Sequence, residues 1–262
     1  MSQIGALTVA HLSSRRRSLL SWGLPLGLMS GFVVAIYPSI EAALSKAVQS
    51  YPSGLKEAFG IGQLSSVEQY LQAEMLSLIV PLSVGYLAVR AVASGLSGAA
   101  EEGRLDVLLS APLARWRLVA AGFAATAVEL AAVLALAAVL TMLGSVIGGA
   151  GLSAGRAAAG FAEVWPLALL FAGLGVIASG FSLRTAVVTG SVAGVLVAMY
   201  VIDLIGKLDP SVSGVRYASV FKYYGKAIDN GIDPLAFVGI TAVATALAAL
   251  GALLFERRDL PA

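Results

Sequence analysis

Six apolar stretches, each long enough to cross a lipid bilayer, are spaced along the 262-residue chain. A hydrocarbon core about 30 Å thick is crossed by about 20 apolar residues in helical form. Hydrophobic residues make up 58% of the chain and charged residues only 12%, which excludes an ordinary water-soluble domain. The sequence therefore predicts an all-α integral membrane protein with six transmembrane helices. The predicted spans are residues 19–37, 75–93, 118–147, 164–183, 185–202 and 235–255.

The stretch from Leu235 to Phe255 carries the clearest signal, because it contains no charged residue and nothing more polar than threonine. A surface helix of a water-soluble protein keeps one polar face, which this stretch lacks. The segment from Val164 to Ile202 is roughly twice one crossing, so we take it as two spans that turn near Arg184. We expect residues 1–262 to form a single transmembrane domain.

The basic residues predict that both termini lie in the cytoplasm, because positive charge is retained on that side during membrane insertion. With this orientation ten of the 17 basic residues fall on the inner side, and they lie close to span ends, where the rule is strongest. The inner set is Arg15, Arg16, Arg17, Arg90, Arg104, Arg115, Arg117, Arg184, Arg257 and Arg258. We expect the plasma membrane of a prokaryotic cell as the location.

The residues before the first span predict an N-terminal interfacial helix. Its apolar side chains would face membrane lipid and its arginines the phosphate headgroups. The basic residues could instead belong to an export signal, but five further spans follow and no cleavage site ends the first apolar run. The formal net charge is only +2, so we expect no nucleic-acid partner.

The segments on the outer side are also predicted to be helical. Ile40 to Val48 repeat at helical spacing, and Ser65 with Glu68 three residues later is a capping-box pattern. Farther along, Asp209-Pro210 breaks the chain before an aromatic-rich stretch. The sequence leaves open whether residues 203–234 lie at the outer interface or dip back into the bilayer.

The segment between the second and third spans, residues 101–112, predicts one short helix in the cytoplasm. Leu105, Leu108 and Leu109 fall on one side of it, and Pro112 prevents it from continuing. Two interpretations are open. The helix can be an amphipathic connector at the headgroups, or it can pass the push of a bound protein into the membrane.

This segment resembles the acidic-Gly-x-Leu-x-x-Leu-Leu-x-x-Pro-x-x-Arg signature of permease subunits of type-2 ATP-binding-cassette (ABC) exporters. The stretch Phe255-Glu256-Arg257-Arg258-Asp259-Leu260 is similar to the usual C-terminal finish of that family, and the span count and loop lengths agree. The residues that the resemblance assigns to docking on a partner are Glu101, Glu102, Gly103, Arg104, Leu105, Leu108, Leu109, Pro112 and Arg115.

The resemblance implies an assembly of two permeases, each engaged through its coupling helix, residues 101–112, by a separate ABC ATPase subunit. The export pathway would alternate between inner and outer access as the ATPases bind and hydrolyse ATP. Closed symmetric pairs are the commonest oligomers, so we expect a homodimer. The family exports antibiotics, lipids, polysaccharides and ions. The apolar composition favours a drug, an antibiotic or a lipid as substrate.

The chain has no Walker phosphate loop of its own. Residues 148–156 come nearest, but Arg156 stands where lysine is needed. We therefore expect that the chain is not an enzyme and binds no cofactor, with ATP and Mg on the partner ATPase.

Cysteine is absent and the only histidine is His11, which leaves no thiolate metal site and argues against an intramembrane serine protease.

Glu129 is the one ionisable residue deep inside a predicted span, about 17 Å from Leu118 at 1.5 Å per residue. An ionised carboxylate at that depth must face protein or water, so Glu129 is a candidate for the substrate pathway. It can equally pair with another helix or sit protonated between two subunits. A different class of protein, an ion-gradient-driven secondary transporter or channel that uses Glu129, explains the same residue.

Two other acids and several glycines receive structural interpretations. Glu163 and Asp203 are predicted near outer span ends, where water solvates a carboxylate. The glycines are predicted to allow close packing of helices and not to line a pore, and they are Gly173, Gly175, Gly190 and Gly194.

Overall fold

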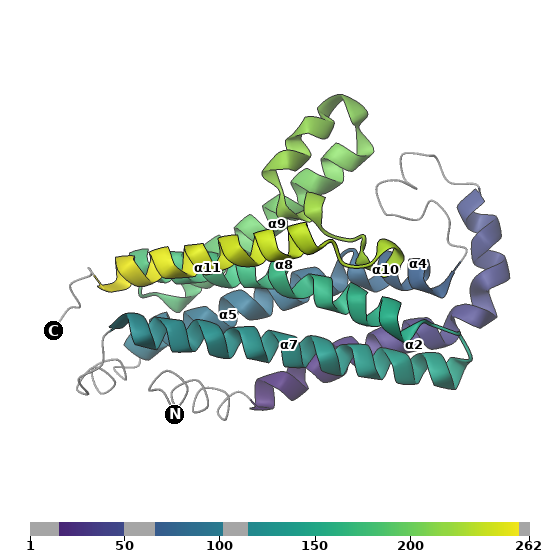
Figure 1. Cartoon of the computed structure of the whole chain (residues 1–262), viewed down its shortest axis with the longest axis horizontal. Helices are drawn as coiled ribbons and strands as arrows, with labels where there is room; N and C mark the ends of the chain where they lie inside the picture. The colour runs from purple at the N-terminus through teal and green to yellow at the C-terminus, as the bar shows by residue number, and fades with distance from the viewer. Residues whose placement is uncertain (1–15, 50–65, 102–114, 257–262) are drawn as a thin grey trace.

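The computed structural model describes residues 16–49, 66–101 and 115–256 (Figure 1). Within these ranges the chain forms helices and short turns, with no strand. The six long helices are α2 (Arg16–Gln49), α5 (Ile79–Glu101), α7 (Arg115–Gly148), α8 (Ala154–Phe181), α9 (Thr185–Leu208) and α11 (Pro234–Glu256). The short ones are α4 (Val67–Leu71), the π-helix η1 (Gln72–Leu76), the 3₁₀ helices η2 (Pro210–Ala218) and η3 (Val220–Tyr223), and α10 (Ala227–Asn230).

The six long helices are each long and apolar enough to cross a membrane, which confirms the predicted all-helical fold with six spans. Several ends differ from the prediction. α8 begins at Ala154 and not at Val164, and α2 continues past Tyr37 and through Pro38 to Gln49. The helical repeat predicted at residues 40–48 is therefore the end of the first long helix and not a separate element.

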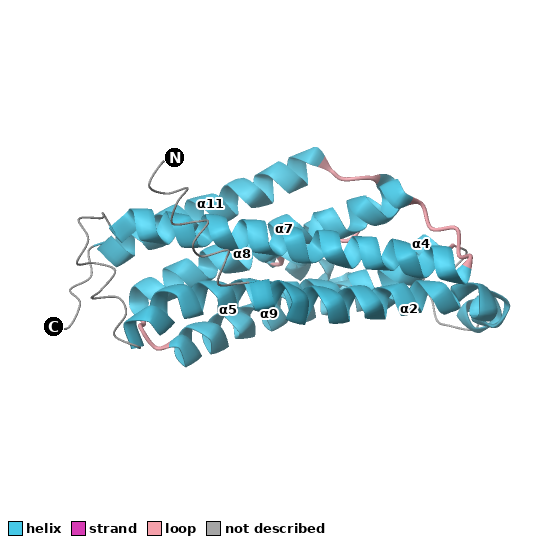
Figure 2. Ribbon diagram, turned by 90° about the horizontal axis from the view of Figure 1, so that it is seen from below, coloured by secondary structure: helices cyan, strands magenta, loops and turns pink. Residues whose placement is uncertain are grey.

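α2 and α7 are the longest helices, with 34 residues each, and they lie side by side (Figures 1 and 2). Glycines bring their backbones together, because a Cβ on Gly31 would stand 2.7 Å from the Leu140 carbonyl oxygen. A Cβ on Gly144 would collide with the backbone of Gly31. At 1.5 Å per residue each helix is about 50 Å long, so both extend beyond a hydrocarbon core of about 30 Å.

α8 is the most buried of the long helices and packs against α5, α7 and α11. A Cβ on Gly173 would lie 2.6 Å from the Ala244 carbonyl oxygen of α11, and one on Gly175 would touch Val92 of α5. The predicted packing role is confirmed for these two glycines. For Gly190 and Gly194 it stays a prediction, since neither has an atom of this chain within 4 Å of its Cβ position.

The short helix α4 is capped by Ser66, whose Oγ accepts a hydrogen bond from the Gln69 N–H at 3.3 Å. The N-cap is Ser66, one residue later than the predicted Ser65, so the predicted capping box is wrong, and Glu68 makes a tertiary contact. Its Oε1 accepts from the Ser153 N–H at 3.3 Å and lies 4.0 Å from Arg156 Nη1, at the start of α8. Ser65 lies outside the described residues.

Between α9 and α11 the chain forms η2, η3 and α10, and Figure 1 shows the end of α9 with η2 projecting from the side of the bundle. The carboxylate of Asp209 starts this segment by accepting hydrogen bonds from the Ser211 N–H at 2.9 Å and Oγ at 2.7 Å. These two bonds hold the pKa of Asp209 below its usual range. Ser219 Oγ then donates to the Met199 carbonyl at 2.7 Å, which returns the chain to α9.

Candidate functional site

A polar pocket of about 340 Å³ lies between α2, α5 and α7, and it contains Glu129, the candidate pathway residue. α7 places Glu129 about 21 Å along the helix from Arg115. The side chain is only 3% exposed. The pocket is lined by Arg17, Ser18, Ser21, Trp22, Leu87, Arg90, Ala91, Ser94 and Glu129.

Arg90 is the residue of this pocket that sequence reasoning missed. The sequence predicts Arg90 next to a cytoplasmic span end, but α5 continues to Glu101, so Arg90 lies at the midpoint of the helix. One feature of the sequence indicates the pocket: Arg90 is the one charged residue in the stretch from 75 to 93. Arginine within an apolar span faces a protein partner or a water-filled cavity, and the pocket provides such a cavity.

The pocket combines opposite charges with hydroxyl and aromatic groups. Two guanidinium groups, of Arg17 and Arg90, line the same space as the Glu129 carboxylate. Charges attract more strongly in the low dielectric of a membrane protein than in water. Trp22 packs on Tyr86 with ring centroids 6.1 Å apart and supplies an apolar wall. This arrangement can hold an amphipathic molecule, with its charge near the polar groups and its apolar part along the ring.

The predicted docking segment is described only at its first residue. Glu101 is the last residue of α5, and α7 begins at Arg115, whose side chain lies outside the described part. The other predicted docking residues also lie outside the described residues, and they are Glu102, Gly103, Arg104, Leu105, Leu108, Leu109 and Pro112. The N-terminal surface helix predicted before Arg16 lies outside them as well. The docking assignment stays a prediction.

Glu101 connects the start of this segment to α9. One carboxylate oxygen accepts a hydrogen bond from the Thr185 N–H at 3.1 Å, and the other accepts from Thr185 Oγ1 at 2.6 Å. Because Thr185 is the first residue of α9, the Glu101 carboxylate lies at the N-terminus of that helix, where the helix dipole favours a negative charge. Nearby, Ser97 Oγ of α5 lies 3.2 Å from both the Ser179 Oγ and the Ser182 carbonyl oxygen. The end of α5 is thus joined to the α8–α9 turn at two points.

The fold and the pocket together define the class: a polytopic, all-helical membrane protein with a charged pocket between its spans. Comparison with protein families narrows this class. Residues 9–256 match the family model described as "Multidrug efflux system permease Rv1217c, C-terminal domain". The match covers nearly the whole chain, and the chain belongs to this family of efflux permeases. The predicted resemblance to an exporter permease is therefore confirmed. A search of the curated proteins gives no match.

Proposed function

We propose that this chain is the membrane-spanning subunit of an ABC exporter and forms the export pathway, while a separate ATPase subunit binds ATP and Mg²⁺ and hydrolyses the nucleotide. The family of multidrug efflux permeases supports this proposal. The observation that carries it is the position of the exporter signature. The signature begins at Glu101, where α5 ends, and runs to Arg115, where α7 begins.

The proposed coupling works through the helices that meet at this segment. A push on residues 102–114 reaches α5 and α7 directly, because both helices are continuous with the segment. It reaches α9 through the two hydrogen bonds between Glu101 and Thr185. In this proposal both termini lie in the cytoplasm, and the ATPase binds from that side of the plasma membrane.

The substrate in this proposal is an amphipathic drug, antibiotic or lipid that enters the pocket between α2, α5 and α7. Glu129 and Arg90 line that pocket within otherwise apolar helices, and intramembrane charges of this kind commonly mark substrate pathways. Trp22 would contact the apolar part of the substrate. Among the described residues of this lining Glu129 is the one carboxylate, and we assign it the role of contacting a cationic group of the substrate against the repulsion of Arg17 and Arg90.

The proposed assembly contains two copies of the chain that meet along α9. Gly190, Gly194 and Ala198 are exposed and recur every four residues on this helix. The same spacing on α2 at Gly23, Gly27 and Gly31 accompanies its close packing on α7. Small residues at this spacing favour helix association in membranes, where backbones can approach closely.

Substituting Leu108 in the docking segment tests the coupling proposal. With the ATPase subunit present in liposomes, Leu108→Asp should abolish ATP-driven efflux and the stimulation of ATP hydrolysis while the protein stays in the membrane. A buried charge in an apolar docking groove is strongly unfavourable. Val107→Asp is the matched control, because helical spacing places Val107 on the opposite side of the predicted helix. Normal efflux by Leu108→Asp would refute the docking assignment.

The alternative function is an ion-gradient-driven secondary transporter, and the buried position of Glu129 in the same pocket as Arg90 is the observation that favours it. Liposomes that contain only this chain distinguish the two. The alternative predicts that a proton gradient drives substrate flux without nucleotide and that Glu129→Gln abolishes this flux. The exporter predicts no such flux.

A further inference from the structure

A second polar pocket, of about 420 Å³, lies at the other end of α9, between this helix, η2, η3 and the π-helix η1. Four basic residues line it: Lys207, Arg216, Lys222 and Lys226. Among the described residues that line it, the only acidic one is Asp203. The lining therefore carries an excess of three positive charges. Neither the coupling segment nor the Glu129 pocket uses this site.

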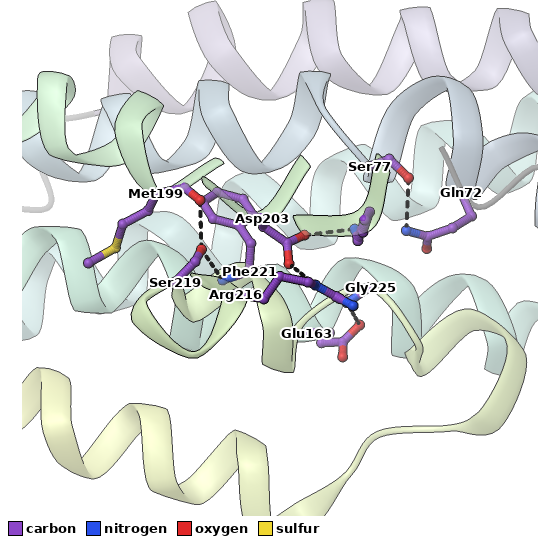
Figure 3. A network of polar contacts seen from close by, with 10 residues as sticks. Gln72, Ser77, Glu163, Met199, Asp203, Arg216, Ser219, Phe221 and Gly225 are labelled. Atoms are coloured by element: carbon purple, nitrogen blue, oxygen red, sulfur yellow. Dashed lines mark hydrogen bonds and ion pairs between the residues drawn. The ribbon is translucent and has the colours of Figure 1, made fainter. Parts of the chain in front are cut away.

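Asp203 organises the cationic side of the pocket. It is 2% exposed, and its two oxygens lie 2.8 Å from Arg216 Nε and 2.8 Å from Lys207 Nζ (Figure 3). Arg216 uses Nε for this contact, so its two terminal nitrogens are not part of it. Among the described residues no carboxylate lies within ion-pair distance of Lys222 or Lys226.

Hydrogen bonds fix the walls of the pocket to η1 and to α9. Tyr224 donates from its hydroxyl at 2.6 Å to the carbonyl of Leu76, the last residue of the π-helix η1, and π-helices are frequent at functional sites. Burial and the nearby Glu163 raise the pKa of Tyr224 well above its usual value, so this hydroxyl keeps its proton. Ser219 ties the pocket to α9.

Glu163 of α8 is held by backbone groups of the loop that carries Lys226. Its Oε2 accepts a hydrogen bond from the Gly225 N–H (Figure 3) and another from the Ala227 N–H, both at 3.1 Å. It therefore anchors the loop that carries Lys226 without lining the pocket, whose Lys222 Nζ lies over the Tyr217 ring.

The depth of the pocket matches the membrane interface. Asp203 lies about 27 Å along α9 from Thr185, close to the thickness of a hydrocarbon core, about 30 Å. Two tyrosines of the same segment, Tyr217 and Tyr223, are 71% and 51% exposed. Exposed tyrosines are enriched where membranes meet water, at the level of the lipid phosphates.

We propose that this pocket binds a phosphate-bearing anion at the membrane interface, the headgroup of an anionic lipid or free phosphate. Phosphate oxygens would accept hydrogen bonds from the terminal nitrogens of Arg216 and from Lys222 and Lys226. A cationic ligand is disfavoured, because the single carboxylate of the lining already holds two cations. The proposal does not depend on coupling to an ATPase.

Binding is measured on the purified full chain in an uncharged detergent, from the shift in its thermal unfolding temperature. The probes are dihexanoyl-phosphatidylglycerol, dihexanoylglycerol, which lacks the phosphate, and inorganic phosphate at constant ionic strength. We expect stabilisation by the first and none by the second. Stabilisation by inorganic phosphate as well identifies the phosphate group as sufficient, whereas stabilisation by the lipid alone shows that the acyl chains contribute.

Lys226→Glu should weaken binding of the stabilising probe about tenfold or more, because it removes one charged hydrogen bond and adds repulsion. Lys226→Gln, which adds no repulsion, should show a smaller loss and serves if the first variant does not fold. Lys46→Glu makes the same charge change at an exposed site on α2, outside the pocket, and should bind normally. The proposal is overturned if dihexanoylglycerol stabilises the protein equally, or if no phosphate probe has an effect. It is also overturned if both Lys226 variants bind normally.

Discussion

Glu129 is the residue on which the proposed substrate site depends most. Its carboxylate is buried and shares a pocket with Arg17 and Arg90 inside apolar helices. Burying an ion costs several kcal/mol unless neighbouring charges and hydrogen bonds compensate. The arginines supply part of that compensation, and a cationic substrate would add to it.

Glu129→Gln keeps the shape of the side chain and removes its charge. We expect efflux of a cationic dye to fall about tenfold or more, which corresponds to the loss of one charged contact, while efflux of an uncharged drug changes little. Initial rates in liposomes with the ATPase subunit measure both. Glu74→Gln, at an exposed position on η1, is the control and should leave both rates unchanged. An equal loss for both substrates would indicate a structural role for Glu129.

Glu101 is the second residue with a specific prediction. Glu101→Ala removes both hydrogen bonds to Thr185, so it should lower the amount of substrate exported per ATP hydrolysed. The cost in stability should be about 1 kcal/mol or less, because the contact is exposed. Thr185→Val removes the hydrogen bond that the Thr185 hydroxyl donates to Glu101 and keeps the one from the Thr185 N–H.

A double-variant cycle separates this contact from other effects. Because Glu101 and Thr185 act through the same contact, Glu101→Ala with Thr185→Val should lose little more coupling than Glu101→Ala alone. Glu256→Ala removes an exposed acid at the end of α11 and should leave coupling unchanged. Additive losses in the double variant would contradict the role of this contact as a link between the coupling segment and α9.

At the scale of helices, the contact between α2 and α7 depends on the absence of side chains at its glycines. A Cβ on Gly144 collides with the backbone of Gly31, and backbone cannot move aside as a flexible side chain can. We expect Gly144→Ala to destabilise the protein by about 1–3 kcal/mol. Gly122→Ala, on the same helix with nothing within 4 Å, should be neutral or slightly stabilising. Equal thermal unfolding temperatures for the two variants would contradict the packing.

The existence of the helices follows from the sequence, whereas several of their ends do not. The long apolar runs predict all six spans, because an apolar helix of this length is stable across the hydrocarbon core of a bilayer. Pro38 and Arg90 look like end signals, yet α2 and α5 continue through them, since tertiary contacts decide where a helix stops. Glu68 shows the same limit, because its capping role loses to the contact with Ser153 of a distant helix.

In the candidate site, too, one residue can be predicted from the sequence whereas its neighbours in space cannot. Glu129 is identifiable from sequence as the lone acid in a long apolar run. Its position near Arg90 and Arg17 depends on how three helices pack, which the spacing along one chain does not encode. The Glu101–Thr185 contact joins residues 84 positions apart, and no local pattern marks it.

At the scale of the whole molecule, the account requires a second copy that covers the exposed small residues of α9. The chain contains no cysteine, so single cysteines report contacts between copies without background. Ser191→Cys, exposed next to Gly190 and Gly194, should form a disulfide-linked dimer in native membranes. Ala242→Cys, exposed on α11, should not. Crosslinking at Ala242 with none at Ser191 would place the contact elsewhere.

The central claim is that this permease moves substrate only when an ATPase subunit drives it from the coupling segment between α5 and α7. The most direct measurement is to purify the chain from its native membrane in mild detergent and to reconstitute it into liposomes with whatever subunit accompanies it. The account predicts a co-purifying, vanadate-sensitive ATPase and substrate transport that requires ATP. Transport driven by an ion gradient, from a preparation that contains only copies of this chain, would contradict it.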